Sequence, residues 1–376
     1  MRIGIEAQRI FRKKKHGMDI VILEVLRQLQ HLHTPHEYFV YAQPDADMEA
    51  LQGSQHVHLE ILGPKSYPVW EQNLLPKATR HNQVDLLHCT SNTAPITTKV
   101  PLVVTIHDII YLEKWMISEG TYYQRFGNLY RRWNVPRIAN KASMIITVSD
   151  YERHRIIEGL KVPADRVRTI YNACGSHFTP ERNADELAAF RKKMNLPERF
   201  ILFLGNTDPK KNLPNVMKAL GLLHQRGKLD FTLVMPDFGK EHLMALLKSQ
   251  NNEHLMTHIM LTGYIPNKEL PNLYRLAELF LYPSLRESFG IPILEAMSCG
   301  TPVITSNTSA MPEVAGEGAI LIDPTQPEQI AEKILTVLND NTLRAQTIKY
   351  GIERASMFSW EKTAREVVGV YEEILR

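Results

Sequence analysis

Short apolar runs alternate with longer amphipathic stretches along most of the chain. In the first half these runs are five or six residues long, which is too short for buried helices and typical of strands buried on both faces. A helical spacing of apolar side chains follows the first run, at Ile20, Leu23, Leu26 and Leu29. The predicted strands lie at residues 3–7, 38–42, 58–62, 84–88, 102–106 and 143–148. Strands separated by helices favour βαβ units and a parallel sheet.

The alternation is interrupted at residues 172–197 and then resumes. The interruption contains Gly175, Pro180 and a charged helical piece that ends at Pro197, a composition typical of a linker. Further strands are predicted at 200–205, 231–235, 258–262, 279–282 and 302–305, and amphipathic helices at 327–338, 342–356 and 360–375. We therefore predict two successive doubly wound α/β domains with a helical tail. Such sheets bind ligands at the carboxyl ends of their strands, so the expected site is the cleft between the domains.

Composition narrows the class of protein. The length of 376 residues allows two domains, each able to bury a core without disulfides. Cys89, Cys174 and Cys299 are far apart and are expected to be inert thiols in a reducing cytosol. A net charge of +3 argues against a dedicated nucleic-acid binder. No apolar run approaches the ~20 residues of a membrane span, and basic residues at 12–15 interrupt any signal peptide, so we expect a soluble, cytoplasmic protein.

The segment 280–305, FLYPSLRESFGIPILEAMSCGTPVIT, carries the most chemistry. A strand is predicted to end at Tyr282, and a helix to begin near Ile291 after a short loop. Gly290 would let the backbone approach a ligand closely, and the unpaired amides of the first helical turn would suit phosphate oxygens.

Two carboxylates frame this predicted phosphate site. Glu287 lies in the loop, and Glu295 lies one turn into the helix among apolar residues. A buried carboxylate without a partner is costly, which favours a functional role for Glu295 over a surface position.

At this motif the chain resembles a known family. ESFGIPILEA resembles the E-x7-E signature of retaining glycosyltransferases of family four, which have the GT-B fold. Residues 263–284 and 300–324 also resemble that family's carboxyl-terminal domain, and 105–112 and 203–213 are similar to its other landmarks. The resemblance covers essentially the whole chain, more loosely in the first domain, and is to bacterial mannosyl- and hexosyltransferases of polysaccharide biosynthesis.

The resemblance implies an α/β architecture of two Rossmann-like domains facing across a cleft, with the last helix crossing back to the first domain. We expect the first, acceptor-side domain at 1–180 together with 357–376, the second, nucleotide-sugar donor-binding domain at 195–356, and a linker at 181–194.

The implied reaction is transfer of a hexosyl group, mannosyl as a first guess, from a nucleotide-diphosphate sugar to a hydroxyl of a glycan or lipid-linked glycan. GDP-mannose or a UDP-hexose is the expected donor. No cofactor and no divalent metal are expected, because a lysine and backbone amides could neutralise the departing diphosphate. The family proposal is front-face attack with the donor phosphate as base, so Glu287 is not assigned as a nucleophile.

The resemblance also implies roles for single residues of the second domain. Lys211 matches the lysine that binds the donor diphosphate, whereas Asn206 stands where many members carry an arginine and can only hydrogen-bond. Glu287 would contact the transferred sugar, and Glu295 would hold the ribose hydroxyls. The remaining donor-binding residues are expected in the glycine loop, through the amides of Ser288, Phe289, Gly290 and Ile291.

In the first domain, His107 matches the histidine that contacts the transferred sugar, and it is expected to be catalytic together with Glu287. Gly17 stands where the family uses a glycine to bring amides to the diphosphate, and it could equally be a loop glycine. Aromatic and basic residues at 122–141 could contact an anionic membrane peripherally, at its cytoplasmic face, or could simply form an exposed helix packed on the sheet.

Other functions fit the sequence less well than the transferase. Asp45 and Asp47 match the DxD metal motif of a different glycosyltransferase fold, but they more readily cap a short helix, and the fifteen histidines lack metal-binding spacings. A nucleotide-sugar epimerase of the same fold would release an epimer without any acceptor. A non-catalytic GT-B partner subunit is the other alternative, to which Asn206 lends some weight. A nicotinamide dehydrogenase is disfavoured because the glycine fingerprint is missing.

Overall fold

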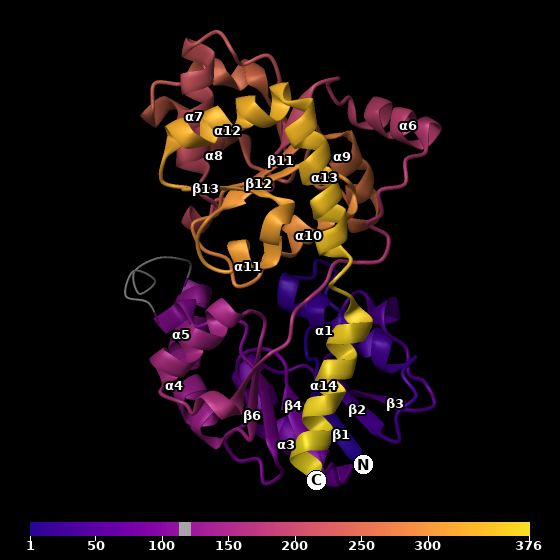
Figure 1. Ribbon diagram of the computed structural model, residues 1–376. Helices are drawn as coiled ribbons and strands as arrows, with labels where there is room; N and C mark the ends of the chain where they lie inside the picture. Colours follow the sequence, from indigo (N-terminus) through magenta and orange to yellow (C-terminus); the bar gives the residue numbers. More distant parts are fainter. Residues whose placement is uncertain (113–121) are drawn as a thin grey trace. The chain divides into compact units, whose positions relative to one another are not determined.

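The computed structural model describes residues 1–112 and 122–376, the side chains of 122–125 excepted, and divides them into two compact units (Figure 1). Unit 1 comprises Met1–Asn172 and Trp360–Arg376, and unit 2 comprises Ala173–Ser359. Each unit is built on one parallel sheet flanked by helices, which confirms the predicted fold class.

The sheet of unit 1 has seven strands in the order β3-β2-β1-β4-β5-β6-β7. All neighbouring pairs are parallel. The strand order reverses at β1, so the switch point of this sheet lies between β1 and β4. The strands are β1 (Arg2–Glu6), β2 (Glu37–Ala42), β3 (Val57–Ile61), β4 (Leu86–Cys89), β5 (Leu102–Thr105), β6 (Met144–Thr147) and β7 (Val167–Thr169).

Helices cover both faces of this sheet, which is why most residues of β1, β2, β4, β5 and β6 are buried. Helix α1 begins at Gly17, where the carboxylate of Asp19 accepts the amide of His16 at 3.0 Å. A π-helical turn at Trp70–Leu74 joins two short helices into one continuous segment. The helices are α1 (Gly17–Leu29), α2 (Tyr67–Val69), α3 (Leu75–His81), α4 (Tyr122–Lys141) and α5 (Asp150–Leu160).

The last helix, α14 (Trp360–Leu375), belongs to unit 1, as predicted. It packs beside α1, and Figure 1 shows it in yellow along that helix. The hydroxyl of Tyr371 lies 2.6 Å from Nδ1 of His88 on β4, and Thr363 donates to the carbonyl of Tyr171. The chain therefore completes its first unit with its last sixteen helical residues.

The sheet of unit 2 has six strands in the order β10-β9-β8-β11-β12-β13, again all parallel. Its order reverses between β8 and β11, which makes that pair the switch point. The strands are β8 (Phe200–Leu202), β9 (Thr232–Met235), β10 (Ile259–Leu261), β11 (Leu279–Tyr282), β12 (Val303–Ser306) and β13 (Ile320–Ile322).

The first helix of unit 2 differs from the predicted linker at 181–194. Residues Ala184–Met194 form α6, whose Leu187 and Phe190 are buried, and Asn272 donates to the carboxylate of Glu186 at 2.8 Å. The division between the units falls between Asn172 and Ala173. The other helices are α7 (Leu213–Gln225), α8 (Lys240–Ser249), α9 (Leu270–Leu276), α10 (Ile291–Ser298), α11 (Met311–Ala315), α12 (Pro327–Asn339) and α13 (Asn341–Ala355).

Candidate functional site

The loops that follow β8 and β11, the two strands at the switch point of unit 2, carry Lys211 and Glu287. The Nζ of Lys211 lies 2.7 Å from Oε1 of Glu287 and donates to the hydroxyl of Tyr282 at 2.8 Å. It also lies 4.6 Å from the centre of the Tyr282 ring. Both charged side chains are largely buried, with 15% and 13% of their surface exposed. The two residues that the sequence assigned separately thus form one ion pair.

The backbone fixes this lysine firmly in place. A 3₁₀ turn at Pro209–Lys211 is capped by Asp208, whose carboxylate accepts the amide of Lys210. The side chain of Asn212 donates to the carbonyls of Pro283 and Pro324, at 3.0 and 2.6 Å. Because the turn is fastened to the segment after β11, the lysine is held beside Glu287 before any ligand arrives.

Glu287 is held in its charged form. Burial by itself would raise the pKa of this carboxyl, but the ammonium groups of Lys211 and Lys210 lower it by more, so the pKa lies below its usual range. The amide of Glu287 donates to Oγ of Ser309, in the loop after the neighbouring strand β12, at 3.0 Å. The carboxylate is therefore ionised and its backbone is anchored.

The turn into α10 brings backbone amides to the same edge of the sheet. Gly290 has φ +102°, a conformation that L residues rarely adopt, and a Cβ there would lie 3.1 Å from Ile293. Pro292 has no N–H, and the amide of Ile293 already donates to the carbonyl of Gly290. An anion site at this helix end would therefore depend on amides that precede Pro292, such as those of Gly290 and Ile291.

The other two residues predicted in this loop contribute differently. The Phe289 side chain is buried, with its ring 5.9 Å from that of Phe358, so any contact of Phe289 with a donor would come from its backbone. Ser288 is half-buried, and it also interacts with other groups of the protein.

Glu295 lies inside unit 2 rather than at its surface. Its Oε2 accepts the hydroxyl of Tyr274 on α9 at 2.9 Å. Burial raises the pKa of Glu295 to about 7, although this hydrogen bond lowers it in part. In contrast to Glu287, this carboxyl has no lysine beside it among the interactions of the described residues, and it is partly protonated near neutral pH.

Asn206 lies exposed in the loop after β8. Its Oδ1 accepts the amide of Asp208 at 2.9 Å, so its carbonyl oxygen stabilises the turn that leads to Lys211. Gly205 precedes it, and a Cβ there would lie 2.1 Å from the ring of Phe203. This loop begins earlier than predicted, because β8 ends at Leu202.

In unit 1, His107 follows β5 and is almost completely buried. Its amide donates to Oδ1 of Asn92, and its Nε2 lies 3.0 Å from the carbonyl of Thr90. A carbonyl only accepts, so Nε2 carries the proton and Nδ1 is the acceptor nitrogen. Burial lowers the pKa of His107, while the Thr90 carbonyl and the carboxylates of Asp108 and Asp19 act against this. The ring is neutral at neutral pH.

Gly17 is the first residue of α1, and nothing lies within 4 Å of a Cβ built on it. The fold itself therefore does not require glycine at this position. The carboxylate of Asp19 in the same helical turn tends to raise the pKa of His107, so the start of α1 lies close enough to the end of β5 for their charges to interact.

Sequence reasoning missed Tyr282 and Ser309, which position Lys211 and Glu287. Both stand where strands of this parallel sheet end: Tyr282 closes β11, and Ser309 follows β12, which pairs with β11. That place at the carboxyl end of adjacent strands is the signal that could have found them.

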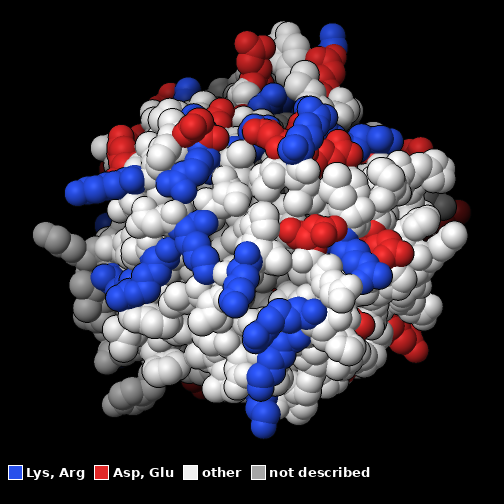
Figure 2. Space-filling view, turned by 90° about the horizontal axis from the view of Figure 1, so that it is seen from below, with Lys and Arg blue, Asp and Glu red and all other residues white. Residues whose placement is uncertain are grey.

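The segment predicted to contact a membrane, 122–141, is α4. The side chains of 122–125 lie outside the described residues, and membrane contact stays a prediction. Phe126 and Leu129 are exposed on this helix, by 62% and 64%. On the face of the molecule shown in Figure 2, Lys and Arg side chains gather in several separate groups with uncharged surface between them. In the described part of the chain, no helix is both long and apolar enough to cross a bilayer.

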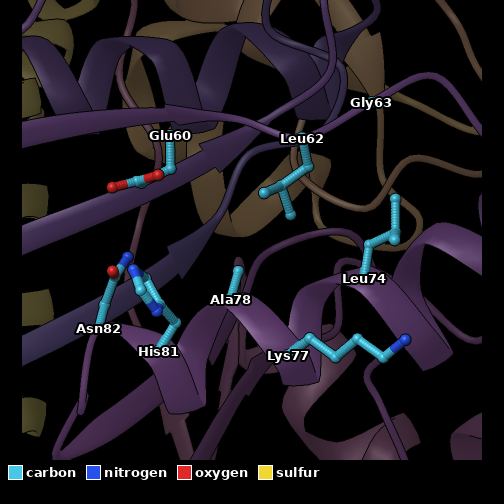
Figure 3. Close-up of a pocket in the computed structure, with 8 residues that line it drawn as sticks. All are labelled: Glu60, Leu62, Gly63, Leu74, Lys77, Ala78, His81 and Asn82. Carbon is cyan, nitrogen blue, oxygen red and sulfur yellow. The ribbon is translucent and has the colours of Figure 1, made fainter.

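A separate cavity of about 350 Å³ lies between β3 and α3 in unit 1. Figure 3 shows Glu60, His81 and Asn82 at one end of it and Leu62 and Leu74 at the other. It contains none of the predicted site residues. Elsewhere, Asp47 pairs with Lys15 instead of capping the 3₁₀ turn that follows it. Among residues 1–112 and 122–376, no group of three or more His, Cys, Asp or Glu is placed to hold a metal ion.

Comparison with known proteins identifies the family. The profile described as Glycosyltransferase Family 4 matches residues 16–174, and the profile described as Glycosyl transferases group 1 matches residues 185–354. The chain is 33% identical to the O-antigen chain mannosyltransferase B of Escherichia coli over 72% of its own length and 70% of that protein. It is 28% identical to the serotype-specific mannosyltransferase WbdA of Escherichia coli over 66% of this chain, but it spans only 31% of that longer protein.

Solved structures share the fold. The crystal structure of Alr3699/HepE from Anabaena, in complex with UDP and glucose, superposes with a TM-score of 0.76 at 18% identity and covers 99% of both chains. WaaG, a glycosyltransferase involved in lipopolysaccharide biosynthesis, gives a TM-score of 0.71 at 15% identity, over 98% of this chain and 99% of its own. Together with the two parallel-sheet units, these comparisons establish the GT-B fold. On its sequence profiles and its mannosyltransferase relative, the chain belongs to the family-four glycosyltransferases.

Proposed function

We propose that this glycosyltransferase moves a hexosyl group, mannosyl in the first instance, from a nucleoside-diphosphate sugar to a hydroxyl of a growing glycan or lipid-linked glycan. The names of the relatives support the mannosyl donor and a role in polysaccharide assembly. The observation that carries the proposal is the Lys211–Glu287 pair beside the amides of α10, at the switch point of unit 2.

The charges of this cluster suit a departing diphosphate. Lys211 offsets Glu287, Lys210 lies 3.6 Å from the carboxylate of Asp208, and the amino end of α10 adds a partial positive charge. An ammonium has three N–H donors, of which Lys211 uses one on Glu287 and one on Tyr282. The third is available to a phosphate oxygen, so Lys211 could bridge the leaving group and the carboxylate.

Glu287 and His107 would act on the transferred sugar. We assign the ionised Glu287 to the hydroxyls of the hexose, where it would also favour the positive charge that develops at the anomeric carbon. The neutral His107 would accept a sugar hydroxyl at Nδ1. The acceptor oxygen would bond to the anomeric carbon on the face from which the diphosphate leaves, and the departing phosphate would take the acceptor proton, so the configuration would be retained.

Donor binding would need no divalent metal in this scheme, because Lys211, Lys210 and the α10 amides supply the positive charge. The ribose hydroxyls would bind at Glu295, and the amide of Gly17 would approach the diphosphate. Asn206 would contribute a hydrogen bond from its amide nitrogen.

A thermal-shift panel of UDP, GDP, ADP and the corresponding hexose donors, run with and without EDTA, tests the donor and the metal together. Ligand at ~100 times its dissociation constant adds about 2.7 kcal/mol of stability. We expect a shift selective for GDP and GDP-mannose that survives EDTA. Loss of the shift in EDTA would contradict metal independence, and no shift from any nucleotide would favour a non-catalytic partner subunit.

The stereochemistry is tested by product analysis. With GDP-α-mannose and a synthetic α-mannoside acceptor, the one-bond ¹³C–¹H coupling of the new anomeric centre distinguishes the anomers. We expect an α-linked product. A β-linked product would contradict retention, and release of an epimerised sugar without acceptor would favour the epimerase.

A further inference from the structure

Unit 1 carries a second constellation of polar and aromatic side chains, near its own switch point between β1 and β4. Its centre is Glu71, which lies in the π-helical turn and is completely buried. The loop after β4 and helix α4 both converge on this carboxyl. Neither the family signature nor the donor chemistry accounts for it.

Among the described residues, the hydrogen-bond partners of Glu71 are neutral groups. Its Oε1 accepts the hydroxyl of Tyr130 on α4 at 2.5 Å and the amide of Gln72 at 2.9 Å, and its other oxygen accepts the hydroxyl of Thr93. Gln72 also donates to Tyr130 at 2.7 Å. The hydroxyl of Tyr67 meets that of Thr93 in turn. Two tyrosine rings from separate helices are thereby held at fixed positions.

These rings belong to a longer row. The Tyr67 and Tyr130 rings meet edge to face at 6.1 Å, and the Tyr130 and Trp133 rings lie 5.8 Å apart. The guanidinium of Arg9 lies 4.6 Å above Tyr67, and that of Arg137 lies 5.2 Å above Trp133. Tyr67 and Tyr130 are partly exposed, and Trp133 is 44% exposed. We call Tyr67, Tyr130 and Trp133 the aromatic row.

A rigid row of partly exposed rings, flanked by the guanidinium N–H donors of Arg9 and Arg137, suits carbohydrate. A sugar ring has an apolar face of C–H groups that packs on an aromatic ring, while its hydroxyls need donors and acceptors at the edges. Because the tyrosine hydroxyls are already fixed by Glu71 and Thr93, binding would cost little side-chain entropy. The carboxyls of Glu71 and Glu6 and the guanidinium groups of Arg9 and Arg137 offset one another in charge, which suits an uncharged ligand.

We propose that the aromatic row is the acceptor subsite of the enzyme, where it stacks against the terminal sugars of an uncharged glycan, and that Glu71 is its positioning residue. The assignment rests on the proposed function for the identity of the acceptor as a glycan. To the expectation that the first domain binds the acceptor, it adds the particular side chains that would contact and select that glycan.

A lipid surface is the competing occupant, and α4 offers a built-in control. Phe126 and Leu129 are more exposed than Trp133 but do not belong to the row. A membrane would use all three apolar side chains, whereas a glycan would depend on the flat ring of Trp133. Trp133→Leu keeps an apolar side chain and removes the ring, and Leu129→Ser is the matched control.

Binding is measured by saturation-transfer NMR with an α-linked mannotriose and with maltotriose, and by sedimentation with phosphatidylglycerol vesicles. We expect the wild-type protein to bind a trisaccharide, Trp133→Leu to weaken it at least ten-fold, and Leu129→Ser to leave it unchanged. Failure of the wild type to bind either sugar would overturn the proposal. An equal loss of trisaccharide affinity in both variants would also overturn it. The same holds if Leu129→Ser abolishes vesicle binding while Trp133→Leu leaves trisaccharide affinity unchanged.

The role of Glu71 is tested by steady-state kinetics of Glu71→Gln, which keeps the size of the side chain. We expect the acceptor KM to rise several-fold, with kcat and the donor KM unchanged, because only the ring positions are disturbed. Equal changes in donor and acceptor KM would indicate a merely structural role and overturn the assignment. Nucleotide binding is followed in parallel, so that a failure of the donor proposal is seen separately from a failure of the acceptor subsite.

Discussion

Glu287 in unit 2 and Glu71 in unit 1 are both largely shielded from water, and both lie near the switch point of a parallel sheet, yet they differ in charge. The ammonium of Lys211 holds the pKa of Glu287 below its usual range in spite of burial. Burial raises the pKa of Glu71 to about 7, and its hydroxyl partners lower it only in part.

The difference shows that the partner, not the fold, decides the charge of a buried carboxyl. Glu295 supports this within a single unit, since it shares unit 2 with Glu287 but has a tyrosine as partner and a pKa of about 7. The two partner types suit two ligands: a carboxylate paired with a lysine lies beside the proposed diphosphate site, and a carboxyl bonded to hydroxyl groups lies beside the proposed sugar site.

The units also differ in how they are completed, and this difference gives the largest expected effect. A chain ending at Ser359 loses α14, whose Trp360, Val367 and Tyr371 are buried in unit 1. Large core side chains contribute about 2–5 kcal/mol each, so unit 1 should lose most of its stability. Calorimetry should show the transition of unit 2 preserved. Tyr371→Phe, which removes only the bond to His88, should cost about 1 kcal/mol, and an unchanged melting profile of the truncated chain would refute the packing.

The next largest effect comes from Lys211→Met, which leaves Glu287 buried without its cation and so turns it into a second Glu71. Breaking such a pair costs about 3–5 kcal/mol. Turnover should fall about 10²–10³-fold, as when one electrostatic donor is removed from a reacting centre. Lys218→Met, an exposed position on α7, is the control. Wild-type turnover in Lys211→Met would show that the lysine partner of Glu287 does not matter for the reaction, and would contradict the contrast drawn with Glu71.

The pH dependence of stability should have opposite signs at the two carboxyls. A pKa raised from 4.5 to about 7 means that, between these two pH values, Glu71 and Glu295 each take up a proton on folding. Each then lowers stability as the pH rises from about 4.5 to 7, by about 3 kcal/mol. Glu287, with a lowered pKa, contributes stability that is present above about pH 4.5 and lost as the pH falls through its folded pKa.

Denaturant unfolding of three Glu→Gln variants at pH 4, 6 and 8 measures these signs. Relative to wild type, the free energy of unfolding of Glu71→Gln and Glu295→Gln should increase as the pH rises, and that of Glu287→Gln should decrease. Parallel curves for Glu71→Gln and Glu287→Gln would mean that Lys211 does not set the charge of its neighbour.

The smallest effect separates backbone strain from ligand contact at two glycines. Gly290→Ala forces an L residue to φ +102° and should cost about 1–3 kcal/mol. Gly17→Ala meets open space, so stability should be unchanged. A weaker nucleotide affinity in Gly17→Ala would then report close approach of the donor to α1, and an unchanged affinity would make Gly17 a loop glycine.

Much of the fold was predictable because buried parallel strands are short apolar runs. The strand Leu279–Tyr282 and the helix Trp360–Leu375 have the predicted bounds. Strand β7 was not predicted, because only Val167 of its three residues is buried and the strand has no apolar run. The linker was misplaced because α6 is charged along most of its length and buries only Leu187 and Phe190.

The site was predictable only where it is local in sequence. The run from Glu287 to Glu295 and the turn at Lys211 each have a recognisable pattern. Their pairing across 76 residues, and the part played by Tyr282 and Ser309, depend on which strands become neighbours. The network around Glu71 joins three segments that are far apart in the chain, at Glu71, Thr93 and Tyr130, so no spacing in the sequence predicts it.

Titration calorimetry of GDP on the wild type, Lys211→Met and Glu287→Gln tests the central claim most directly, namely that Lys211 binds the donor diphosphate and is paired with Glu287 until it does. We expect Lys211→Met to weaken GDP at least ten-fold, since a charge-assisted hydrogen bond is lost. Glu287→Gln should bind GDP as well as the wild type or more tightly, because the lysine no longer has a competing partner. Wild-type affinity in Lys211→Met, or a loss in Glu287→Gln as large as that in Lys211→Met, would contradict the account.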